Sequence, residues 1–147
     1  MRELIELQSG QVAFISGLMS GFALAVAAHV LRYGIRSRVA QATFLLLLLT
    51  SLLFLLALYT ETRLGIEVAG REAVPPDALE AIARVRDVGT GGATVAFFLF
   101  VLSIGLIGWL ATPLTGLIST AIAAATAAAL FLAWRDIGEI SARLAGS

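Results

Sequence analysis

The sequence predicts an all-α integral membrane protein with four transmembrane helices. Apolar residues make up 59% of its 147 residues and charged residues only 14%, and the mean hydropathy is +0.96. Soluble domains carry about a quarter charged residues and under half apolar ones. The core of a soluble domain of this length cannot hide so much hydrocarbon from water. The apolar residues also gather in four stretches of about 20 residues, the length that crosses the hydrocarbon layer of a bilayer.

Each apolar stretch ends near a tyrosine or tryptophan, which favours the headgroup level because its ring is apolar and its polar atom stays hydrated. These residues support the boundaries of the four spans and a single membrane domain over 1–147. The aromatic residues are Tyr33, Tyr59, Trp109 and Trp134. The spans run over about residues 11–33, 39–59, 93–111 and 116–134.

The four spans differ in composition, and the differences predict their surroundings. The first is preceded by the acids Glu3 and Glu6, and a signal peptide has a basic leader, so we do not expect this span to be a cleaved signal peptide. The second is almost continuous leucine, which is typical of a lipid-facing surface. The third and fourth are joined by residues 112–115, too few for anything but a tight turn, and the alanine-rich fourth is suited to close packing.

Residues 61–90 form the only long polar connector. Asp77 follows two prolines and precedes Glu80 by three residues, which predicts a capping box and a helix start. We expect a short helix that lies on the membrane or packs on its neighbours, with a helix that docks a protein partner as the alternative. The glycine-rich stretch 89–92 then predicts a hinge into the third span, since it follows no strand and lacks the lysine of a phosphate-binding loop.

The arginine count indicates the orientation. With four spans, both termini lie on the side of the 61–90 connector, and that side has seven arginines against three on the other. The positive-inside rule counts basic residues and favours cytoplasmic termini in the cell (inner) membrane. The three opposing arginines, Arg32, Arg36 and Arg38, nevertheless form the densest basic cluster.

Several function classes are excluded by composition. Ten basic and ten acidic residues leave no basic surplus for a nucleic acid, and the chain has no cysteine. No Asp, Glu or Arg falls in the middle of a predicted span, which argues against proton-coupled transport, paired-carboxylate hydrolysis and a carboxylate metal site. One histidine and two methionines are a poor source of haem ligands. We expect no enzyme activity, no cofactor and no metal.

The first span has two distinct faces when residues are placed 100° apart around the helix. One face is apolar in the middle and polar at both ends. It comprises Gln11, Phe14, Leu18, Phe22, Ala25, His29, Arg32 and Arg36, and we call it the α-stripe. The other face is rich in small residues that allow close helix packing, with a GxxxG pair on the flank. The expected packing residues are Ser16, Gly17, Ser20 and Gly21.

His29 is the one titratable residue placed within a predicted span, near its end. Two interpretations stay open: it is solvated by headgroups at the interface, or it belongs to a functional stripe. The stripe as a whole has the same two interpretations. In a homo-oligomer around the first helix it lines a pore with a hydrophobic constriction, which gates by dewetting. In a compact four-helix bundle it is core.

The segment Ser20-Gly21-Phe22-Ala23-Leu24 resembles the pore helix of the Orai calcium channels, which have Ser-Gly-Phe-Ala-Met near the middle of the first of four helices. The resemblance covers about ten residues. It implies a pore lined by the first helix, with Leu18 and Phe22 as hydrophobic-gate residues and Ala25 at a further pore position. His29 stands where that family has its selectivity glutamate, so the resemblance does not extend to calcium selection.

The function that these observations favour is an oligomeric ion channel or small pore in the lipid bilayer, lined by the first helix. Arg32, Arg36 and Arg38 give such a pore a basic mouth, which attracts anions or repels divalent cations. The alternative is a non-conducting scaffold or subunit that binds a protein partner through the 61–90 connector.

Overall fold

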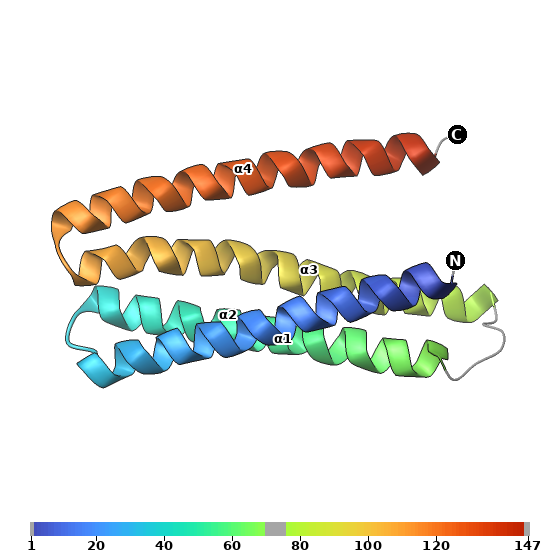
Figure 1. The fold of residues 1–147 in the computed structure, drawn as a ribbon, viewed down its shortest axis with the longest axis horizontal. Helices are drawn as coiled ribbons and strands as arrows, with labels where there is room; N and C mark the ends of the chain where they lie inside the picture. The colour runs from blue at the N-terminus through green and yellow to red at the C-terminus, as the bar shows by residue number, and fades with distance from the viewer. Residues whose placement is uncertain (1, 70–75, 146–147) are drawn as a thin grey trace. The chain divides into compact units, whose positions relative to one another are not determined.

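The computed structural model describes residues 2–69 and 76–145, and this part of the chain is all-helical (Figure 1). The helices are α1 (Arg2–Tyr33), α2 (Arg38–Ala69), α3 (Pro76–Ile107), the short 3₁₀ helix η1 (Gly108–Leu110) and α4 (Pro113–Ala145). The predicted all-helical class is confirmed. Four helices are long and apolar enough to cross a membrane, over Gly10–Arg32, Arg38–Glu67, Glu80–Leu110 and Pro113–Ile140. This is the architecture of a multi-pass membrane protein.

The helices are longer than the hydrophobic spans that the sequence marks. Each of α1, α2 and α3 has 32 residues and α4 has 33. At 1.5 Å per residue each helix is about 48 Å long, against a hydrocarbon layer of about 30 Å. Hydropathy marks only the part of a helix that suits hydrocarbon, whereas the helices α2 and α3 extend into the polar connector from either side. The connector is therefore helical over 61–69 and 76–90.

The hinge predicted at residues 89–92 is wrong, because α3 runs without a break through these glycines. Gly89 is buried, and a Cβ there would lie 2.6 Å from Thr60 Oγ1 and 3.2 Å from Glu61 Oε1. Glycine at this position allows α3 to approach α2 closely. The helix start is found at Pro76, while the side chain of Asp77, the expected N-cap, lies outside the described residues.

The chain divides into two compact units, residues 1–100 and 101–147. In the first unit, α1 and α2 lie side by side as an antiparallel pair (Figure 1). The connection between them is short: Gly34, with φ +91°, ends α1, and Ser37 directly precedes α2. The Ser37 hydroxyl accepts a hydrogen bond from the Ala40 N–H at 3.0 Å, as an N-cap does. The first part of α3 packs on α2 through an edge-to-face contact of Phe54 and Phe97, with ring centroids 5.3 Å apart.

The second unit contains the end of α3, η1 and α4. The tight turn expected at 112–115 is present, since only residues 111–112 separate η1 from α4. Ser119 donates a hydrogen bond to the Gly105 carbonyl at 2.7 Å, and Trp109 Nε1 donates to Thr120 Oγ1 at 2.9 Å. These two bonds hold α4 against the end of α3 and against η1.

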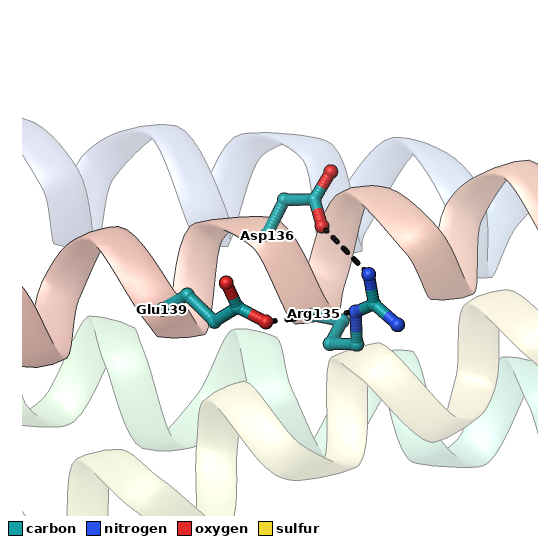
Figure 2. A network of polar contacts seen from close by, with 3 residues as sticks. All are labelled: Arg135, Asp136 and Glu139. Carbon is teal, nitrogen blue, oxygen red and sulfur yellow. Dashed lines mark ion pairs between the residues drawn. The ribbon is translucent and has the colours of Figure 1, made fainter.

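Farther along α4, the charged side chains interact within their own helix. Figure 2 shows Arg135 with its Nη2 3.6 Å from Asp136 Oδ1 and its Nε 3.8 Å from Glu139 Oε1. All three side chains are more than half exposed. Exposed ion pairs of this kind contribute little to stability, so they position charge at this end of α4 more than they hold the fold together.

Candidate functional site

The contact between α1 and α2 is a seam of small and hydroxyl-bearing residues. Its members recur every three or four positions on both helices, the spacing of two helices that wind around each other with a left-handed supercoil. On α1 the buried residues are Ser16, Ser20, Ala23, Ala27 and Val30. The buried residues of α2 are Ala40, Thr43, Leu47, Thr50, Ser51, Phe54, Ala57 and Glu61, of which Phe54 and Glu61 also meet α3. Small side chains let two helix backbones approach closely, which is how helices associate in lipid.

Ser20 and Ser51 join the two helices at the middle of this seam. The Ser20 hydroxyl donates to the Ser51 carbonyl at 3.0 Å, and the Ser51 hydroxyl donates to the Ser20 carbonyl, also at 3.0 Å. Each hydroxyl has a single proton, so the 3.1 Å between the two Oγ atoms is a close approach and not a third bond. We call this reciprocal arrangement the serine pair.

The α-stripe lies away from the seam. Phe14 is 72% exposed, Leu18 62% and Phe22 57%, and Gln11, Ala25, His29 and Arg32 are exposed as well. Phe22 also makes an edge-to-face contact with Phe100 of α3, with centroids 5.9 Å apart. The structure therefore places these residues on one open face of α1, flanked by α3 at Phe22.

Arg36 and Gly21 do not lie where the helical pattern of α1 predicts. Arg36 is not on α1, because the helix ends at Tyr33 and the positive φ of Gly34 turns the chain away; extending the helical pattern to Arg36 was wrong. The GxxxG pair is divided, since a Cβ on Gly17 would lie 3.5 Å from Leu58 Cδ2 whereas one on Gly21 would meet open space. Only Gly17 is close to α2.

The turn between α1 and α2 holds the basic cluster. Arg32 lies in the last turn of α1, Arg38 begins α2, and Arg36 lies between them; all three are exposed. None of the ion pairs between described residues involves these arginines. Cations near the C-terminus of a helix complement its dipole, which suits Arg32. We refer to Arg32, Arg36 and Arg38 as the arginine turn.

Sequence reasoning missed Glu61. It was assigned to the polar connector, yet its side chain is only 2% exposed and it lies within the apolar part of α2. The buried positions 54, 57 and 61 continue the spacing of the seam, and this periodicity is the signal that identifies it. On α3, Gly89 faces it, and Arg86 lies one turn away on the same side as Gly89. A buried carboxylate at this depth is costly unless polar groups surround it.

The described residues contain no group of three or more His, Asp or Glu side chains suited to holding a metal ion. What the arrangement provides is helix contact, an open apolar face and a basic end. Comparison with known proteins adds no further assignment: no family model, no curated protein and no solved structure matches this chain.

Proposed function

We propose that the protein self-associates in a cell membrane through α1 and forms a small pore. The observation that carries this proposal is the division of α1 into two faces. The seam face is used within the chain by α2, and the α-stripe faces outward with Phe14, Leu18 and Phe22 exposed. A helix that exposes a stripe with an apolar middle and polar ends has the pattern needed to line a pore between several copies.

In such an assembly the aromatic and leucine side chains of the stripe form the narrowest part. Rings of apolar side chains block ions because water leaves a narrow hydrophobic passage. His29 and Arg32 then lie toward the mouth, where like charges from several copies attract anions or repel divalent cations. The resemblance of residues 20–24 to the Orai pore helix supports this arrangement, with His29 as the departure that removes calcium selection.

The orientation that we propose has both termini in the cytoplasm. It is supported by the seven arginines on the side of the termini and the 61–90 connector, against three in the arginine turn. We propose no catalytic role; among the described residues, no group of three or more His, Asp or Glu side chains could hold a metal ion.

The test is ion flux in liposomes that contain the purified protein. Phe22→Ala removes bulk from the constriction and is expected to raise the leak severalfold. Leu24→Ala is the matched control, because Leu24 is 51% exposed but lies off the stripe. Leu18→Ala tests the same constriction by its effect on the leak and leaves the contact of Phe22 with Phe100 in place. If neither stripe variant changes the flux relative to the control, the pore proposal fails.

A second candidate is a non-conducting scaffold that binds a protein partner. It is favoured by one observation: α2 and α3 continue as helices beyond the predicted spans, with Glu80, Arg84 and Asp87 exposed on α3. The oligomeric state in detergent separates the candidates. A ring of several copies that conducts supports the pore, whereas a monomer without flux supports the scaffold.

A further inference from the structure

The ends of the α1–α2 pair differ in charge. Between Glu6 and Glu61 the sequence has no Asp or Glu, and the arginine turn lies within this acid-free stretch. Every acid of the chain belongs to the segments on the other side of the predicted spans, together with the remaining seven arginines. Along α2, Glu61 is separated from Arg38 by about 35 Å at 1.5 Å per residue. The arginine turn therefore has no acid of its own pair of helices within reach.

The position of the arginine turn determines where its charges lie relative to the bilayer. Arg32 is the last residue of the apolar stretch Gly10–Arg32, and Arg38 is the first residue of the next one, Arg38–Glu67. In a bilayer, charges at such a boundary lie at the level of the headgroups. The short connection of residues 34–37, with Gly34 and Ser37 at its ends, keeps the three exposed arginines at the same end of the helix pair.

We propose that the arginine turn is a binding surface for the phosphate groups of anionic lipids. A guanidinium is planar and always charged, and its fork of N–H donors matches two phosphate oxygens at once. Clustered basic residues beside a transmembrane helix attract anionic lipids, and this attraction falls within a Debye length. The proposal does not depend on a pore, because the three arginines are already exposed in a single chain.

The arginines on the side of the termini and the 61–90 connector serve as the comparison for lipid binding. Arg63 lies 4.0 Å from Glu67, and Arg135 pairs with Asp136 and Glu139. Acids next to these arginines cancel their charge at the distance of a headgroup, whereas none of the ion pairs between described residues involves the arginine turn. We expect the lipid preference to follow the arginine turn and not the total number of arginines.

The experiment measures the affinity of the detergent-solubilised full chain for phosphatidylglycerol and for phosphatidylcholine with identical acyl chains, by native mass spectrometry. The wild type is expected to prefer phosphatidylglycerol, and raising the salt concentration is expected to weaken that preference. Replacing Arg32, Arg36 and Arg38 by Gln is expected to lower the affinity for phosphatidylglycerol by about tenfold or more. It leaves the affinity for phosphatidylcholine unchanged.

The control variant replaces Arg63, Arg84 and Arg135 by Gln, which changes the net charge equally and is expected to alter the affinity less than twofold. Equal losses in the two triple variants would overturn the proposal, because bulk charge would then explain the preference. A wild type that binds both lipids equally, or whose preference ignores salt, would overturn it without any variant. Displacement of the lipid by inorganic phosphate at constant ionic strength would assign the turn to free phosphate and also overturn it.

Discussion

Removing one hydroxyl of the serine pair tests how α1 and α2 are held together. Ser20→Ala deletes the bond from the Ser20 hydroxyl to the Ser51 carbonyl and leaves the reverse bond, from Ser51 to the Ser20 carbonyl, in place. The substitution leaves no cavity larger than the oxygen. The Ser51 carbonyl keeps its place within α2, where a backbone N–H of the next turn is its usual partner.

The expected magnitude follows from this geometry. A hydrogen bond between helices in a membrane contributes about 0.6 kcal/mol on average and at most about 1.7 kcal/mol. We therefore expect Ser20→Ala to reduce the free energy of unfolding by about 0.6 kcal/mol, roughly a threefold change in the equilibrium constant. Because each hydroxyl donates to the other residue's carbonyl, Ser51→Ala is expected to cost the same, and the double variant about twice as much.

The assay is reversible unfolding in mixed micelles, applied to the two single variants and the double variant as a double-mutant cycle. Thr126→Val is the control: it removes an exposed hydroxyl that bonds only within its own helix, to the Ile122 carbonyl at 2.9 Å. Additive costs support the reciprocal bonds. A double variant no less stable than either single variant would refute the reasoning, since it would mean that the two hydroxyls share one bond between their Oγ atoms.

Three further predictions concern crowded or buried positions, and the first two are measured in the same unfolding assay. Gly89→Ala places a Cβ against Thr60 and should destabilise the protein by about 1–3 kcal/mol, whereas Gly91→Ala, with nothing within 4 Å, should stabilise it by up to about 1 kcal/mol. Thr50→Val should be neutral or stabilise by about 1 kcal/mol, because Thr50 Oγ1 is buried with no hydrogen-bond partner among the described residues; a clear loss of stability would reveal a partner. Gly116→Ala should displace the Trp109 indole that covers this glycine and shift its fluorescence, and an unchanged spectrum in a Trp134→Phe background would contradict this packing.

The four helices were predictable because hydropathy averaged over 20 residues is a strong signal. The two faces of α1 were predictable too: the small residues that helical periodicity places opposite the stripe include Ser16 and Ser20, and these are buried. The residue on α2 that these serines contact was not predictable. Nothing in the sequence of α1 specifies that Ser20 meets Ser51, because that pairing depends on the length of the connection at residues 34–37 and on the antiparallel register of α2.

Local composition was misleading where one residue type serves two purposes. Glycines at 89–92 favour a hinge when they are read alone, but they also let helices approach, and the burial of Gly89 beside Thr60 shows the second use. Glu61 was assigned to the polar connector because it is charged, although it continues a buried seam. Arg36 was placed on a helix because the 100° spacing was extended past Gly34, whose φ of +91° ends that helix.

The serine pair joins residues only 31 positions apart, through a connection that spans residues 34–37. The entropy lost on closing so short a connection is small, and pairings that are local in sequence form faster than distant ones. The buried residues described in α1 and α2 all lie at or before Glu61, so both sides of the seam are synthesised before α3 and α4. We therefore expect α1 and α2 to enter the bilayer as a finished hairpin, which then serves as the surface on which the later helices assemble.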